Sequence, residues 1–212
     1  MDMDRLYLQN RVLGMIGEDA MAEAEVKMPT ATAVELMDEL VATAKANGMI
    51  GKTLAEQEIF EAQLMDLMTP PPSVVNGLFA QHYANDPVEA TDYFFELCKT
   101  NDYIKTRGIA KNIVFPAETE YGTLEITINL SKPEKDPKEI AAQRNAATVA
   151  YPKCMLCMEN EGYKGLLNYP ARTNHRIIRM NLDGEGWGFQ YSPYAYYNEH
   201  CIILSDEHRP MK

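Results

Sequence analysis

The sequence of 212 residues lacks the features that mark membrane, exported or disulfide-rich proteins. No apolar run approaches the roughly 18–20 residues that a membrane span needs, and the acidic start MDMDRLYLQN is not a signal peptide. Four cysteines are too few for a disulfide scaffold, and without an export signal they indicate reduced thiols in a cytoplasm. With 46% hydrophobic and 24% charged residues, disorder is also excluded. We expect a cytoplasmic globular protein with no membrane partner.

Positive charge is scarce in the first half of the chain. Residues 1–100 contain 6 basic and 17 acidic side chains, whereas residues 101–212 contain 14 of each. The whole net charge of −11 therefore lies in the first half. Because nucleic acids attract basic surfaces, a nucleic-acid partner is not expected.

The first half is predicted to be helical. Capping boxes begin at Thr32 and Thr53, each with a glutamate three residues later. The helices that they open should end at Asn47-Gly48 and before Pro70–Pro72. Further helices are predicted over Leu6–Ile16, after Ser73 and over Val88–Tyr103.

The second half is predicted to be rich in strands. Thr123–Leu130 alternates strictly between polar and apolar residues, which predicts a half-buried strand. A short helix is predicted over Lys138–Ala147. Further strands are predicted over His175–Leu182, Trp187–Tyr191 and His200–Ser205, with a turn at Asp183–Gly186 between the first two. A helical region over residues 1–110 and a strand-rich region over residues 111–212 predict the α+β class.

Cys154 and Cys157 form a Cys-x-x-Cys pair, in which two thiolates can chelate one tetrahedral metal ion. A buried structural pair and a redox pair are the alternatives. Redox pairs normally open a helix after a strand, whereas this pair has a loop-like setting, which favours a metal. His208 follows the last predicted strand, from which the chain could turn back to the cysteines. Downstream, the chain offers as further ligands His175, His200, Cys201 and His208.

Aromatic residues are concentrated between residues 187 and 197. Packing in a sheet is their usual role, and a platform for a sugar or a base is the alternative. Polar groups for such a platform would come from Gln190, Ser192 and Asn198. Three arginines close upstream could meet a phosphate or lie on a solvated face, and they are Arg172, Arg176 and Arg179.

Several segments of the second half carry a family resemblance. They are Glu125–Pro137, Tyr151–Tyr163, Asn168–Arg172, Asn174–Ile178 and Trp187–Tyr194. These segments resemble the UDP-glucose–hexose-1-phosphate uridylyltransferases of the second, bacterial class. The resemblance is dense from about residue 121 onward, and the helical first half resembles the N-terminal region of the class with fewer specific motifs. Proteins of this class are considerably longer, so we expect this chain to be their N-terminal part.

The resemblance implies uridylyl transfer between UDP-glucose and galactose 1-phosphate in galactose metabolism, through a uridylyl-histidine intermediate. It implies an α+β fold related to the histidine-triad proteins, present here as a truncated antiparallel-sheet portion. No histidine of this chain stands in a His-x-His or His-x-Asn-His setting. The nucleophilic histidine is therefore expected beyond Lys212, and the chain alone is expected to be inactive. The resemblance is compatible with a homo-oligomer and does not decide the oligomeric state.

The resemblance also implies site residues. Zinc would be held by Cys154, Cys157 and His208. Leu156 would touch uracil, and residues 190–193 stand where the first class has a uridine-binding Asn-Asp-Phe-Pro segment, although only the proline is shared. We expect one wall of a nucleotide cleft to be lined by Leu156, Gln190, Tyr191 and Pro193.

Two other functions are compatible with the residues. The first is a non-catalytic module that uses the zinc knuckle to bind a nucleotide or a protein. The second is a thiol redox protein, which predicts a low pKa at Cys154 or Cys157.

Overall fold

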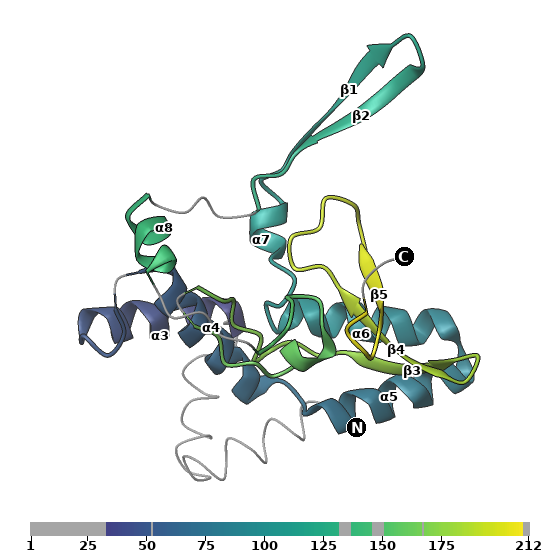
Figure 1. The fold of residues 1–212 in the computed structure, drawn as a ribbon, viewed down its shortest axis with the longest axis horizontal. Helices are drawn as coiled ribbons and strands as arrows, with labels where there is room; N and C mark the ends of the chain where they lie inside the picture. The colour runs from purple at the N-terminus through teal and green to yellow at the C-terminus, as the bar shows by residue number, and fades with distance from the viewer. Residues whose placement is uncertain (1–32, 52, 132–136, 146–150, 167, 210–212) are drawn as a thin grey trace.

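The computed structural model describes residues 33–51, 53–131, 137–145, 151–166 and 168–209. Helices come first, followed by a two-stranded and then a three-stranded antiparallel sheet (Figure 1), which confirms the α+β class. The elements are α3 (Ala33–Ala46), α4 (Leu54–Met68), α5 (Pro72–Asn85), α6 (Pro87–Thr100), α7 (Thr106–Ile109), β1 (Ile113–Thr119), β2 (Gly122–Ile128), α8 (Pro137–Arg144), the 3-10 helix η1 (Met158–Asn160), β3 (Ile178–Leu182), β4 (Glu185–Tyr191) and β5 (Cys201–Ser205). The helix predicted over Leu6–Ile16 and the cap at Thr32 lie outside the described residues.

Capping residues set the helix starts. The Thr53 hydroxyl accepts the Glu56 N–H at 3.3 Å, and the Glu56 carboxylate accepts the Thr53 N–H at 3.3 Å, which confirms the predicted capping box of α4. Asp86 caps α6 by accepting the N–H of Val88 at 2.9 Å. In the described part of the chain, no helix is both long enough and apolar enough to cross a membrane.

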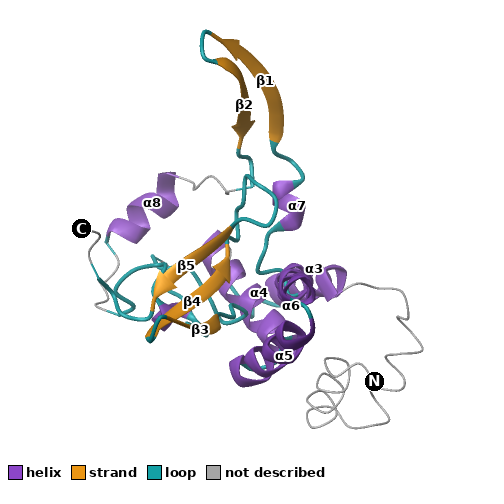
Figure 2. Ribbon diagram, turned by 90° about the vertical axis from the view of Figure 1, so that its right-hand side faces the viewer, coloured by secondary structure: helices purple, strands orange, loops and turns teal. Residues whose placement is uncertain are grey.

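Helices α5 and α6 pack against one face of the three-stranded sheet (Figure 2). Phe94 of α6 contacts Phe189 and Tyr191 of β4, with ring centroids 5.4 Å apart in both pairs. The core contains residues from both sides of position 110, so the predicted helical and strand-rich regions share one hydrophobic cluster. A domain boundary at residue 110 stays a prediction. The buried members of the cluster are Val75, Phe94, Cys98, Tyr103, Ile104, Ile178, Phe189 and Tyr191.

The three-stranded sheet has the order β3-β4-β5. The pairing of Leu182 with Glu185 leaves Asp183 and Gly184 as a two-residue turn. Both turn residues have positive φ, 52° and 84°, which is the geometry of a type I′ hairpin. The turn predicted at Asp183–Gly186 is therefore confirmed.

Strands β1 and β2 form a hairpin that projects away from the helices and the other sheet (Figure 1). The strand predicted over Thr123–Leu130 is confirmed as β2, but its predicted half-burial is wrong. Leu124, Ile126 and Ile128 are 52%, 38% and 45% exposed. Strict alternation shows that a strand has an apolar face and does not show that another element covers it. The partner strand was not predicted, because three successive apolar residues and Pro116 interrupt any alternation in β1.

Candidate metal centre and nucleotide-binding residues

Three potential metal ligands come together from two distant segments. The Sγ atoms of Cys154 and Cys157 are 3.0 Å apart, and the Cys157 Sγ is 3.0 Å from the Nδ1 of His208. The three ligand atoms lie within 4.8 Å of one another. The cysteines lie in the loop before η1, whereas His208 follows β5. Two thiols and an imidazole are donors that zinc prefers.

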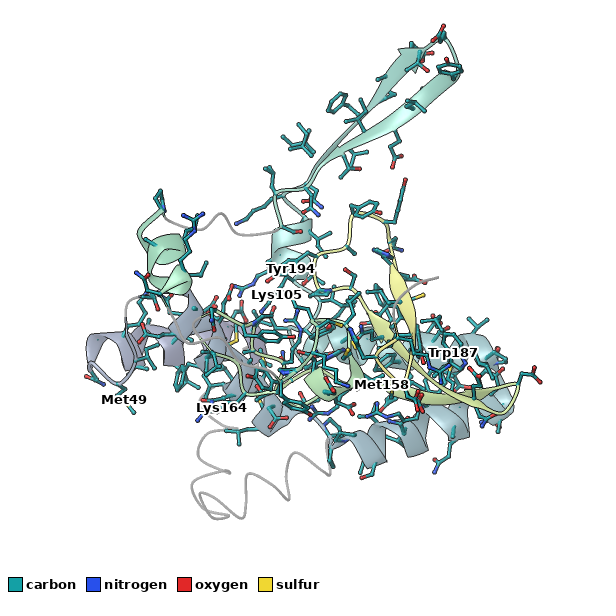
Figure 3. The ribbon with its side chains drawn as sticks, in the orientation of Figure 1. Met49, Lys105, Met158, Lys164, Trp187 and Tyr194 are labelled. Atoms are coloured by element: carbon teal, nitrogen blue, oxygen red, sulfur yellow. The ribbon has the colours of Figure 1, made fainter. Side chains whose placement is uncertain are left out.

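The cysteine loop is tied to the sheet. The carboxylate of Glu161 accepts the N–H of Ile177 at 2.6 Å and pairs with Arg179. Met158 of η1, labelled in Figure 3, lies against Gly188 of β4, where an added Cβ would be 3.3 Å from its sulfur. The loop therefore packs on the sheet and is joined to the segment that leads into β3.

The thiol environment disfavours a redox pair. Cys157 is 8% exposed, and burial raises the pKa of its thiol to about 11, with a further rise from the hydrogen bond to Cys154. Reactive redox cysteines instead have pKa values below the ordinary value of about 8.5. Cys157 therefore lacks the lowered pKa of a redox nucleophile, and the imidazole of His208 beside the two sulfurs completes a donor set of the kind that holds a metal.

The structure does not bring the other ligand candidates to this cluster. His175 is 1% exposed and stacks on Tyr103 at 4.3 Å. Burial, helped by three nearby arginines, lowers the pKa of His175 well below its ordinary value. His200 borders a cavity of about 360 Å³ together with Tyr196. Cys201 is exposed and lies opposite Tyr191 in the sheet.

The four predicted nucleotide contacts do not share one wall. Leu156 is 51% exposed between the two cysteines. Tyr191 is buried in the core, where its hydroxyl donates to the carbonyl of Thr91 at 3.2 Å. Gln190 is also buried, but as the next residue of a strand it points to the opposite face. Pro193 lies beyond the strand, in a separate cleft.

Pro193 borders a cleft between α4 and the loop before α7. Its carbonyl accepts the N–H of Lys105 at 2.9 Å, and the Lys105 ammonium forms a 2.6 Å ion pair with Asp102. Tyr194 and Arg172 border the same cleft, and Figure 3 shows Lys105 and Tyr194 close together. The cleft is therefore lined by two cationic side chains, Lys105 and Arg172, and by two carboxylates, Glu58 and Asp102.

The other two arginines considered for phosphate binding have structural partners. Arg176 is 3% exposed, and it donates to the carbonyl of Pro70 at 2.7 Å and to the carboxylate of Asp66 at 2.8 Å. Arg179 is engaged by Glu161. Of the three arginines, Arg172 is the one that borders the cleft.

Sequence reasoning missed two polar residues beside the cysteines. Asn160 is fully buried, and the side chain of Glu161 is 7% exposed. For Asn160 the available signal was its position three residues after Cys157, because the buried carbonyls of a tight turn need hydrogen-bond donors. Glu161 follows directly, and its carboxylate instead accepts the N–H of Ile177.

Comparisons with known proteins identify the family of this chain. The protein-family model for the N-terminal domain of galactose-1-phosphate uridyl transferase matches residues 1–210. The chain is 60% identical to the galactose-1-phosphate uridylyltransferases of Pediococcus pentosaceus and Lactiplantibacillus plantarum and 54% identical to that of Enterococcus faecalis. The matches cover 99% to 100% of this chain and 42% of each relative. No solved structure matches the chain. The chain therefore belongs to the galactose-1-phosphate uridyl transferase family and corresponds to its N-terminal domain.

Proposed function

We propose that the whole protein transfers a uridylyl group between UDP-glucose and galactose 1-phosphate in galactose metabolism. The observation that carries this proposal is 60% identity to named galactose-1-phosphate uridylyltransferases over nearly the whole chain. Because the chain spans 42% of the length of these relatives, it would contribute part of the site. The β3-β4-β5 sheet would be the portion that resembles the histidine-triad fold, and its antiparallel order supports this assignment.

The metal of this site would be zinc, held by Cys154, Cys157 and His208. The donor set fits, because all three ligand atoms lie within 4.8 Å of one another and are of types that zinc binds. Bound zinc would supply a fixed positive charge and join the cysteine loop to the segment after β5. The orientation of the cysteine loop comes from the protein itself, because the loop packs on β4 through Met158.

Leu156 is the strongest of the proposed nucleotide contacts, since its half-exposed side chain stands between the two cysteines. Pro193 would contact the ligand from the cleft that also holds Lys105 and Arg172. Gln190 and Tyr191 are buried on opposite faces of β4, so their contribution would be to hold that strand and its neighbouring segments in place.

None of the described histidines is suited to be the uridylyl acceptor. His175 is buried against Tyr103, and His208 would be a ligand of the proposed metal beside Cys154 and Cys157. His82 makes a 2.8 Å contact with Glu89 on the helical side of the molecule. His200 borders a cavity without a neighbouring histidine. We therefore propose that the nucleophile is none of the four.

The metal proposal is tested by the zinc content of the purified chain. One zinc ion per chain is expected, and Cys154→Ser and His208→Gln should each abolish stable binding. His200→Gln is the matched control and should retain zinc. Zinc content that is unaffected by the first two substitutions would refute the assignment.

The transfer proposal is tested with UDP-glucose that carries a radiolabelled uridylyl phosphorus. The chain should bind the sugar nucleotide without turnover or stable covalent label, and Leu156→Ala should weaken binding. An acid-labile, base-stable label would contradict the statement on the nucleophile. Zinc binding without any affinity for UDP-glucose would favour the non-catalytic zinc-knuckle module. Formation of UDP-galactose by the whole protein is the direct test of the activity.

A further inference from the structure

One buried amide joins the two ends of the cysteine turn. Asn160 is the last residue of η1 and is 0% exposed. Its Nδ2 donates to the carbonyl of Cys154 and, at 3.2 Å, to the carbonyl of Cys157. Its backbone N–H donates to the same Cys157 carbonyl at 3.0 Å. Asn160 therefore contacts the backbone of both cysteines.

The turn itself is closed weakly. The Cys157 N–H donates to the Cys154 carbonyl at 3.3 Å, slightly beyond the usual range of about 2.7–3.2 Å for such bonds. A turn that rests on one long hydrogen bond leaves its peptide planes free to rotate, and each rotation moves the attached Cβ and sulfur. The bond from the Asn160 amide to the Cys154 carbonyl removes this freedom at the first cysteine, and its bond to the Cys157 carbonyl adds to the one that the Asn160 backbone N–H makes there.

We propose that Asn160 is a positioning residue for the Cys154–Cys157 turn, which it holds so that both sulfurs face His208. The inference rests on the proposed metal centre, because metal binding is the use of this geometry. Ligands that are already oriented bind a metal more tightly, since their ordering is not left to the binding step.

The chemistry of the contacts requires an amide. Both partners are carbonyl oxygens, which only accept hydrogen bonds, and the NH2 group of asparagine offers two donors. A carboxylate of the same shape offers none and would face two oxygens. Asn160→Asp therefore keeps the volume and removes the function. A second polar contact, from the N–H of Lys153 to the carboxylate of Glu159 at 3.0 Å, leaves the carbonyls untouched.

The first experiment measures metal affinity with Co²⁺, whose thiolate absorption reports coordination by cysteine. Asn160→Asp should weaken Co²⁺ binding about 10–100-fold, the usual effect of losing a residue that supports metal ligands. Asn174→Asp is the matched control, because Asn174 is also buried and its Nδ2 donates to the carbonyl of Asn101 at 2.8 Å. The control should bind Co²⁺ like the parent, and circular dichroism should show the same fold in all three proteins.

The second experiment separates the positioning role from the metal. Phenylarsine oxide bridges two neighbouring thiols, so it reports sulfur geometry in the metal-free protein. In a Cys201→Ser background, which removes the exposed thiol, Asn160→Asp should bind the arsenical about tenfold more weakly than the parent. If the parent binds the arsenical and no Co²⁺, the metal proposal fails while the weakening still tests Asn160. Affinities for both probes within about twofold of the parent would overturn the inference.

A third variant guards against misfolding. Should Asn160→Asp lose its circular dichroism signal, Asn160→Gln keeps both donors on a side chain that is one methylene longer. Its affinities for both probes should fall below those of the parent in a folded protein. Parent-like affinities in Asn160→Gln would then refute the positioning role.

Discussion

The two sheets of this protein have the same antiparallel pairing, but only one has a covered apolar face. Phe189 and Tyr191 of β4 are 7% and 3% exposed beneath α5 and α6. Leu124 and Ile126 of β2 are 52% and 38% exposed on the projecting hairpin. A period of two therefore predicts a strand and its apolar side, whereas coverage depends on elements elsewhere in the chain.

The sheets also differ on their second faces. Gly188 of β4 admits Met158 of the cysteine loop, so the three-stranded sheet supports the core on one side and the cysteine loop on the other. The opposite face of the hairpin carries Glu118 and Glu125, which are exposed. We expect the free energy of unfolding to depend strongly on the three-stranded sheet and weakly on the hairpin.

The largest effect should follow from Phe94→Ala. Phe94 is 0% exposed, and its removal leaves a cavity beneath β4, so the free energy of unfolding should fall by about 3–5 kcal/mol. Phe115→Ala on the hairpin, where the ring is 40% exposed, is the control and should cost less than about 1 kcal/mol. Urea unfolding measures both. Equal losses would show that the hairpin is as important to stability as the core.

Gly188→Ala should have the next largest effect. The added Cβ would lie 2.9 Å from Ile177 and 3.3 Å from Leu204 and Met158, so we expect a loss of about 1–3 kcal/mol. Gly77→Ala is the control, because its Cβ would meet nothing within 4 Å inside helix α5, and it should be neutral or stabilising. Thermal unfolding compares the two variants. A stable Gly188→Ala protein would mean that Ile177, Leu204 and Met158 do not pack closely on Gly188.

His175 should make the folded state sensitive to acid. Because the pKa of His175 is lowered in the folded state, the unfolded chain binds a proton near pH 6.5 that the folded chain refuses. Stability should therefore be unaffected by this group at high pH and fall by up to about 1.4 kcal/mol per pH unit below pH 6.5.

His175→Phe keeps a ring against Tyr103 and removes the titration. The difference in unfolding free energy between parent and variant should change with pH only below about 6.5. Urea unfolding between pH 8 and pH 5 measures it. Parallel pH profiles would show that His175 is protonated in the folded protein.

The smallest effect is expected from Ile126→Thr, which keeps a β-branched residue on the open face of β2. The free energy of global unfolding should change by less than about 0.5 kcal/mol. Ile178→Thr in β3, where the side chain is 2% exposed, is the matched control and should be clearly destabilising. A large loss in Ile126→Thr would mean that this face is covered in solution.

Local signals accounted for much of the fold. The Thr53 capping box, the Asp183-Gly184 turn and the strand at β2 depend on neighbouring residues, and all three are confirmed. The prediction that four residues line one wall of a nucleotide cleft did not take the alternation of side chains along a strand into account. Gln190 and Tyr191 are adjacent in a strand, so alternation alone sends their side chains to opposite faces.

The sequence by itself determined the Thr53 capping box, the hairpin turn, the Cys154–Cys157 pair and the family. These depend on short spacings and residue types, whose physical effects act within a few residues. The family resemblance already indicated His208 as the histidine beside the cysteines, and the structure brings the three residues together. Only the tertiary structure decided that Asn160 spans the cysteine turn and that β2 stays uncovered while β4 is buried. Contacts between distant segments depend on how whole helices and strands pack, and no local pattern determines which apolar face another element covers.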